Sequence, residues 1–195
     1  TLAGLSQHAP GSLLLYVSSA HVYEPSPTPR NETAATAPTE VYGAAKLAAE
    51  SALGVLAPIS GVRLAIVRPF NHIGPRQRKG FVAADFAAQL AEIEAGLRPP
   101  EIVVGALDVA RDFSDVRDIV RGYHLALVQG EPGETYNLGS ERAHTVREML
   151  ETLSEFDDTL LEQLIEDIAP EKSLIYRDLH DEFGADLIVP VLVGA

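Results

Sequence analysis

Short runs of consecutive apolar residues alternate along the chain with longer segments whose apolar positions recur at helical spacing. The uninterrupted runs are typical of buried parallel strands, which pack against apolar neighbours on both faces. We predict buried strands of this kind at residues 12–19 and 61–70, a short strand at 101–105 and a further strand at 134–140. The segments with helical spacing predict helices at residues 38–57, 81–96, 114–130 and 145–153.

The order of these elements indicates the fold class. Strands alternate with helices, which favours an α/β domain with a largely parallel sheet. Polar residues at two helix starts predict N-caps at Thr39 and Ser114, and an acidic first turn follows Ser114. Residues 24–40 contain four prolines and are loop-like, and the segment is long enough to cover a functional site.

Length and composition limit the class of protein. The 195 residues suit one domain, and an apolar fraction of 46% supports a hydrophobic core. The absence of cysteine excludes disulfides, a thiol nucleophile and a cysteine metal site. The stretch "HDE" at residues 180–182 has no further residue at ligand spacing, so we predict no metal site.

The charge balance is acidic, with 15 Lys and Arg against 28 Asp and Glu and a formal net charge of −13. Such a surface repels nucleic acid and anionic membranes, so we expect neither as a partner. The N-terminus lacks a basic region followed by an apolar core, and the apolar run near the C-terminus is short and interrupted by Pro190. We therefore predict a cytoplasmic protein.

The stretch "VYGAAK" at residues 41–46 carries the first candidate chemistry. In a helix, Tyr42 and Lys46 project from the same face. A lysine ammonium beside a phenol favours the phenolate, which makes the tyrosine a better proton carrier near neutral pH. Taken alone the pair is a common coincidence, and two unrelated residues on a helix surface would give the same pattern.

Two serines follow the predicted strand at 12–19, at the sheet edge where α/β proteins bind their ligands. A serine hydroxyl there, facing a tyrosine on the next helix, can hold a substrate carbonyl while the tyrosine moves a proton. The alternative is that Ser18 and Ser19 merely cap a turn.

Five ordered blocks resemble the extended short-chain dehydrogenase/reductase family, the NAD-dependent epimerase/dehydratase family that acts on nucleotide sugars. The blocks are "YVSSAHVY", "VYGAAK", "RPFNHIGPRQ", "RDFSDVRDIVRGYHLAL" and "GETYNLGS". The stretches "RPFNHIGPRQ", "AEIEAG" and "RDFSDVRD" are most similar to the GDP-4-keto-6-deoxymannose reductases, with the GDP-mannose 4,6-dehydratases nearby. The resemblance covers about residues 1–153 and favours the catalytic interpretation of Tyr42 and Lys46.

The resemblance implies a catalytic role for three residues. Ser19 matches the family Ser/Thr that hydrogen-bonds the reacting sugar oxygen, and Tyr42 matches the general acid/base. Lys46 matches the lysine that binds the nicotinamide ribose and assists the tyrosine. Tyr42 and Lys46 are thereby also expected to contact the cofactor, NADP or NAD.

The resemblance also implies four further contacts. His72 matches a position that contacts the cofactor in the dehydratases, and a structural role in a loop is the alternative. Asn71 matches a substrate-contacting asparagine. Arg111 matches the arginine that clamps the nucleotide diphosphate, for which a forked guanidinium is suited. Arg76 is expected to assist in substrate binding, with a solvated loop arginine as the alternative.

One departure concerns the cofactor. Neither G-x-x-G-x-x-G nor G-x-G-x-x-G, the Gly-rich turn that holds the dinucleotide in the family, occurs in residues 1–195. We therefore expect the chain to start inside a helix before the family's fifth strand, with the N-terminal cofactor half missing. The strand at 12–19 would then lack a neighbour and leave an exposed edge. On this expectation the isolated chain self-associates, binds NAD(P)H weakly and shows no reductase activity.

Other departures bear on the reaction and on the C-terminus. His21 stands where dehydratases carry a glutamate for removing water, which favours a reductase, although a histidine can also transfer a proton. Glu24 replaces the glycine of the family's "VYG". Residues 154–195 fit the family poorly, with an acidic amphipathic helix and a final strand expected there.

The sequence thus predicts the C-terminal part of a Rossmann-like parallel sheet with a small interleaved substrate-binding subdomain. Residues 1–153 are interpreted as a truncated NAD(P)-dependent epimerase/dehydratase-type domain and residues 154–195 as a divergent segment. The complete enzyme is expected to reduce GDP-4-keto-6-deoxymannose at C4 with NAD(P)H, and to be a homo-oligomer. The alternatives are a 4,6-dehydratase or sugar-nucleotide epimerase, or a catalytically silent chain that binds sugar nucleotide.

Overall fold

A computed structural model of the chain describes residues 2–154. Within this range the chain divides into two compact units that alternate along the sequence. The first comprises residues 2–72 and 114–141, and the second comprises residues 73–113 and 142–154. The predicted acidic helix, final strand and "HDE" stretch lie outside the described residues. The division agrees with the prediction of a small interleaved subdomain.

The first unit is built on a parallel sheet with the strand order β1-β2-β5. These strands are Leu13–Val17, Arg63–Pro69 and Thr135–Leu138, which confirms three of the four predicted strands. Val17 aligns with Val67, and Arg68 aligns with Asn137. Among residues 2–154, β1 pairs with β2 alone, so it forms an edge of this sheet, as the sequence predicted.

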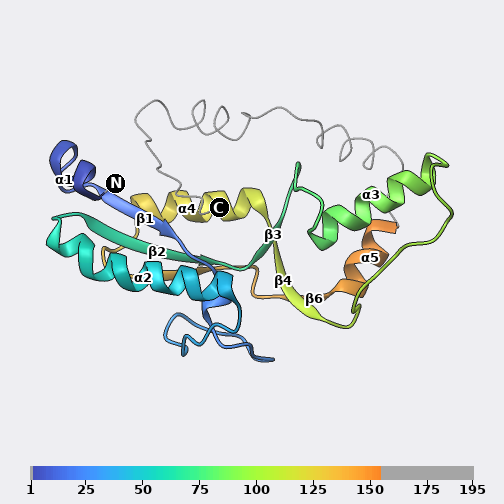
Figure 1. The fold of residues 1–195 in the computed structure, drawn as a ribbon, viewed down its shortest axis with the longest axis horizontal. Helices are drawn as coiled ribbons and strands as arrows, with labels where there is room; N and C mark the ends of the chain where they lie inside the picture. Colours follow the sequence, from blue (N-terminus) through green and yellow to red (C-terminus); the bar gives the residue numbers. More distant parts are fainter. Residues whose placement is uncertain (1, 155–195) are drawn as a thin grey trace. The chain divides into compact units, whose positions relative to one another are not determined.

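Helices cover both faces of this sheet (Figure 1). On one face α2 (Val41–Ile59) and α1 (Leu2–His8) pack against a cluster that includes Leu14 and Leu64. On the other face α4 (Val116–Val128) packs against a cluster that includes Val67, which is completely buried. Burying one such aliphatic side chain contributes about 1.5–3 kcal/mol, which explains why the middle of β1 and β2 is apolar.

The second unit combines a small sheet with two helices. Its strands are β3 (Asn71–Ile73), β4 (Ala110–Asp115) and β6 (Ala143–Thr145), in the order β3-β4-β6. The chain passes between the units within β3 and again within β4. Helices α3 (Val82–Glu94) and α5 (Val146–Ser154) pack on each other, and α5 also contacts β6. The helix predictions were confirmed, whereas β3 and β6 were missed because three-residue strands carry too little periodicity.

The predicted strand at 101–105 was wrong. This segment has no regular structure, and Val103 is 73% exposed. The side-chain amide of Gln89 accepts a hydrogen bond from the Val103 N–H at 2.8 Å and donates one to its carbonyl at 3.1 Å. Because a side chain satisfies both backbone groups, Val103 needs no strand partner. The nearby strand is β4, which overlaps the predicted start of the next helix.

Both predicted N-caps were also displaced by one residue. Helix α2 is capped by Glu40, without a side-chain hydrogen bond, and not by Thr39. Helix α4 is capped by Asp115, whose carboxylate accepts from the N–H of Arg117 at 2.8 Å, and not by Ser114. A charged acceptor satisfies a free N–H at a helix start better than a hydroxyl does, which accounts for the second shift. No helix in residues 2–154 has both the length and the apolar character needed to span a membrane.

Gly43, in the first turn of α2, allows this helix to approach the short 3-10 helix η1 (Ala20–Val22). A Cβ atom at position 43 would overlap the backbone carbonyl of His21 and would lie 2.9 Å from Cβ of Pro38. Glycine is therefore required here for contact between two segments, although it disfavours a helix locally.

We predict that Gly43→Ala destabilises the chain, with Gly54→Ala as the matched control. Gly54 lies in the same helix, and a Cβ atom added there would meet no atom within 4 Å, so alanine should raise the free energy of unfolding by about 0.5–1 kcal/mol. Alanine at position 43 should instead lower it by about 1–3 kcal/mol, because η1 and α2 must separate. Urea unfolding measures both; equal stabilisation by the two substitutions would contradict the close contact.

Candidate active site

The carboxyl end of β1 carries two buried serines. Ser18 and Ser19 are 2% and 6% exposed. Ser19 caps η1, and its Oγ accepts a hydrogen bond from the N–H of His21 at 3.2 Å. That bond uses a lone pair and leaves the hydroxyl proton of Ser19 available to a ligand oxygen. The buried Oγ of Ser18 has no hydrogen-bond partner among the described residues.

Lys46 connects this end of β1 with Tyr42. Its Nζ donates to the carbonyl oxygen of Val17 at 3.0 Å and lies 5.7 Å from the ring centre of Tyr42. It also lies 5.5 Å from the ring centre of Tyr16 on β1. Partial burial lowers the pKa of Lys46. The two residues of the "VYGAAK" stretch thus lie on one face of α2, as their spacing predicted.

Two other tyrosines lie in the same region, and their environments differ from that of Tyr42. Burial raises the pKa of Tyr123 to about 12, with a smaller contribution from Tyr42. Burial, followed by the charges of Glu50 and Tyr42, raises the pKa of Tyr16. Both phenols therefore remain protonated at neutral pH. Tyr42 is 53% exposed beside the Lys46 ammonium, which makes it accessible for proton exchange with a ligand.

His21 borders Tyr42 directly. The two ring centres are 5.8 Å apart in an edge-to-face arrangement. Nδ1 of His21 lies 3.5 Å from the carboxylate of Glu40, the residue that caps α2. His21 is therefore adjacent to the candidate acid/base.

The remaining first-unit candidates follow β2. Asn71 is exposed, and His72 is half-buried on the same short strand β3. Nδ1 of His72 lies 3.0 Å from the carbonyl oxygen of Phe70. Since a carbonyl can only accept, Nδ1 carries the proton in this contact.

The two candidate arginines belong to the second unit. Arg111 lies on β4, is exposed, and donates from Nη1 to the carbonyl of Ala110 at 3.0 Å. Arg76 is exposed and has a φ of +65°. This left-handed conformation costs a non-glycine residue about 1–2 kcal/mol, and such strain often accompanies a functional constraint.

The second unit also contains a cavity that the sequence did not reveal. It measures about 610 Å³ and is bordered by α3 and the segments on either side of it. Glu92 lies between two cations, 3.3 Å from Lys79 and 3.5 Å from Arg98. Asp85 adds a second carboxylate to the lining, so its charges balance and do not by themselves select an anionic ligand. Neither Arg76 nor Arg111 borders this cavity.

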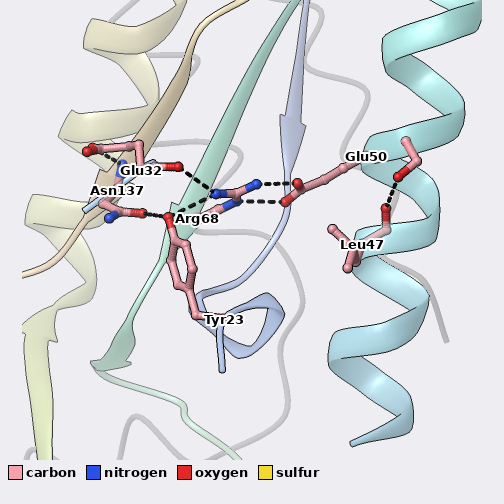
Figure 2. A network of polar contacts seen from close by, with 7 residues as sticks. Tyr23, Glu32, Leu47, Glu50, Arg68 and Asn137 are labelled. Atoms are coloured by element: carbon pink, nitrogen blue, oxygen red, sulfur yellow. Dashed lines mark hydrogen bonds and ion pairs between the residues drawn. The ribbon is translucent and has the colours of Figure 1, made fainter. Parts of the chain in front are cut away.

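A buried ion pair between Arg68 and Glu50 holds α2 to the sheet (Figure 2). Nε and Nη2 of Arg68 donate to the two carboxylate oxygens of Glu50 at 3.0 and 2.6 Å, and both residues are less than 10% exposed. Nη1 of Arg68 donates to the hydroxyl of Tyr23 at 2.9 Å, which donates to Oδ1 of Asn137 at 2.7 Å. Burial acts to lower the pKa of Arg68, but the hydrogen bonds and charge of Glu50 and Tyr23 outweigh it and raise that pKa.

Comparison with known proteins identifies the family. Residues 2–139 match the NAD dependent epimerase/dehydratase family. The chain belongs to this family. GDP-6-deoxy-D-mannose reductase of Pseudomonas aeruginosa is 39% identical over 151 residues, covering 76% of this chain and 50% of the relative. The structure of RMD from Pseudomonas aeruginosa complexed with NADPH superposes with a TM-score of 0.75 at 38% identity, covering 79% of this chain and 54% of that one.

These matches confirm the predicted fold class and the resemblance stated above: the chain is an α/β, Rossmann-like member of an NAD(P)-dependent enzyme family. It spans about half the length of the reductase that it matches. A match of another kind covers 25% of the chain. The elongation factor G-like protein of Synechocystis is 55% identical over 49 residues, which are 7% of its own length.

We predict that breaking the buried ion pair from one side is costly. Arg68→Met or Glu50→Leu leaves one charge buried without its partner and should lower the free energy of unfolding by about 3–5 kcal/mol. The double substitution removes both charges, so its cost should be well below the sum of the two. The exposed pair Arg121–Asp118 provides the control, and Arg121→Met should change stability by less than about 1 kcal/mol. Additive single substitutions in a urea-unfolding cycle would show that the pair is not coupled.

Proposed function

We propose that the intact protein is a nucleotide-sugar oxidoreductase that reduces GDP-4-keto-6-deoxymannose at C4 with NAD(P)H. The observation that carries the proposal is the position of Lys46. Its ammonium donates a hydrogen bond to the carbonyl of Val17, directly before the two serines, and lies beside the ring of Tyr42. The similarity to a protein named GDP-6-deoxy-D-mannose reductase supports the choice of substrate.

In this proposal Tyr42 and Ser19 act on the ketone oxygen. NAD(P)H, when bound, supplies the hydride to the carbonyl carbon. Ser19 donates its hydroxyl proton to the ketone oxygen as a hydrogen bond, since its own oxygen is already anchored by the N–H of His21. Tyr42 transfers its proton to the same oxygen as negative charge develops there, and the positive charge of Lys46 stabilises the phenolate that remains.

The donors present fit the ribose end of NADP or NAD. Lys46 has three N–H donors and uses one on Val17, so the others can reach sugar hydroxyls. Tyr42 offers a hydroxyl on the same face of α2, and His72 is the further candidate on the nicotinamide side. No Gly-rich turn in residues 1–195 is assigned to the pyrophosphate.

Asn71, Arg76 and Arg111 are the proposed substrate contacts. A guanidinium pairs two phosphate oxygens through its fork, so an exposed arginine on β4 suits a nucleotide diphosphate. The left-handed backbone of Arg76 is consistent with a side chain held for binding.

The residue beside Tyr42 favours a reductase over a 4,6-dehydratase. Removing water needs an acid/base next to the reacting sugar, and His21 occupies the position of the dehydratase glutamate. Incubating the intact protein with GDP-mannose and, separately, with the 4-keto sugar nucleotide plus NAD(P)H tests the proposal. Reduction of the 4-keto sugar nucleotide without conversion of GDP-mannose supports the proposal. Conversion of GDP-mannose would indicate a dehydratase, and interconversion of two sugar nucleotides would indicate an epimerase. If the protein shows none of these three activities, it is a silent chain that binds sugar nucleotide.

We predict that Tyr42→Phe in the intact protein lowers kcat by at least about a hundredfold, because it removes the proton carrier and keeps the ring. Affinity for the sugar nucleotide should change little. Tyr136→Phe is the matched control, because that hydroxyl accepts the N–H of Glu131 within the first unit and has no proposed role in catalysis. Steady-state kinetics measures both variants, and near-normal turnover of Tyr42→Phe would refute its assignment.

For Arg111→Ala we expect a rise in KM with kcat nearly unchanged. Its contact with the diphosphate would be the same in ground and transition states, so its loss removes uniform binding. Arg121→Ala, a change of equal charge on the exposed surface of α4, should leave KM unaltered. GDP titration by calorimetry provides the direct measurement; unchanged GDP affinity would make Arg111 a structural residue.

A further inference from the structure

The loop of residues 24–40 is attached to the sheet along its length. Tyr23, just before the loop, forms an antiparallel bridge with Thr36 within it. In its middle, the carbonyl of Arg30 accepts from Nδ2 of Asn137 at 3.0 Å, and the carboxylate of Glu32 accepts from the backbone N–H of Asn137 at 2.8 Å. A long segment without helix or strand is thereby held at a defined place, in contrast to a free lid.

Asn137 takes part in the contacts with Arg30 and Glu32 and also binds Tyr23. Figure 2 shows its contacts with Tyr23 and Glu32. Asn137 lies on β5 in register with Arg68 on β2. The direction of each hydrogen bond follows from chemistry. Arg68 can only donate, so the Tyr23 oxygen accepts from it and gives its single proton to Oδ1 of Asn137. The amide nitrogen of Asn137 is then left to donate to Arg30, and both ends of the amide are used.

The loop that Asn137 holds is the covalent connection between the two sides of the candidate site. It starts directly after η1, which Ser19 caps, and it ends at Glu40, which caps α2 two residues before Tyr42. Near that end, Pro38 lies against the position of Gly43 in the first turn of α2. A displacement of the loop would therefore be transmitted to the segment that carries Tyr42.

We propose that Asn137 is a positioning residue: by tying the Arg30–Glu32 segment to the end of the sheet, it holds η1 and the first turn of α2 in the arrangement in which Ser19 and Tyr42 act on one substrate oxygen. The effect that this inference predicts on catalysis rests on the proposed function. The structural part of the inference can be tested without turnover: the side-chain amide and the backbone N–H of residue 137, with Nη1 of Arg68 donating to the Glu32 carbonyl at 3.4 Å, hold the loop and the start of α2.

Asn137→Asp is the decisive substitution, because it keeps size and the acceptor for Tyr23 but replaces the donor to Arg30 with a charged acceptor. The new negative charge also lies on the residue whose backbone N–H binds the carboxylate of Glu32. In the intact protein, we expect amide hydrogen exchange of residues 30–36 and of residues 44–47, the first hydrogen-bonded N–H groups of α2, to accelerate by about tenfold, and trypsin to cut after Arg30 faster by a similar factor. Mass spectrometry reads both, and cleavage after Arg78, in the other unit, is the internal reference.

Two further variants separate loss of the loop contact from general damage. Glu32→Ala removes the acceptor for the Asn137 N–H and should show the same changes, whereas Glu32→Gln keeps an acceptor oxygen and should restore the normal behaviour. Ser26→Ala removes a hydrogen bond to Thr28 that stays within the loop, and should leave exchange, cleavage and turnover unaltered.

The catalytic consequence is read from kcat and KM together. Asn137→Asp should lower kcat by about tenfold while KM for the sugar nucleotide stays within about twofold, because the proposed substrate contacts are untouched. Unchanged exchange at residues 44–47 would overturn the proposal, as would faster exchange throughout the protein, or a released loop with normal kcat. If the wild-type protein turns over no 4-keto sugar nucleotide, the proposed function fails, while the exchange data still decide whether Asn137 holds the loop and α2.

Discussion

The buried ion pair between Arg68 and Glu50 is the interaction on which the first unit depends. Removing two charges from water is costly, and the cost is offset here because the guanidinium fork meets both carboxylate oxygens. The pair joins the central strand of the sheet to the middle of α2, the helix that carries Tyr42 and Lys46. The third nitrogen of Arg68 extends the connection to Tyr23, so one side chain orders the helix and the segment after the serines.

Close backbone approach adds a second constraint at the same end of the sheet. Because Gly43 has no Cβ atom, the carbonyl of His21 can lie against it, and η1 packs closely on the first turn of α2. As a result the side chains of His21 and Tyr42 meet edge to face, and Lys46 reaches the carbonyl that ends β1. The arrangement gives the exposed phenol a neighbouring positive charge, whereas burial keeps the phenols of Tyr16 and Tyr123 protonated.

Much of the fold and part of the site could be predicted from the sequence. Mostly apolar runs identified β1 and β2, because strands covered by helices on both faces bury most of their side chains. The four-residue spacing of Tyr42 and Lys46 predicted their common face of α2. The same reasoning failed at 101–105, where "EIVVG" has the composition of a strand but Gln89 satisfies the backbone of Val103. Composition does not report which group will complete a backbone hydrogen bond.

The sequence by itself determined the alternation of strands and helices, the family resemblance and the candidates for proton transfer. Each of these depends on local periodicity or on a short motif. Only the tertiary structure decided the partners of Arg68, the requirement for glycine at position 43 and the attachment of the loop to Asn137. These features join residues that lie far apart in the chain, and they arise from which strands become neighbours and in which register. Side-chain pairing of that kind leaves no periodic signal, because it is set by packing in three dimensions.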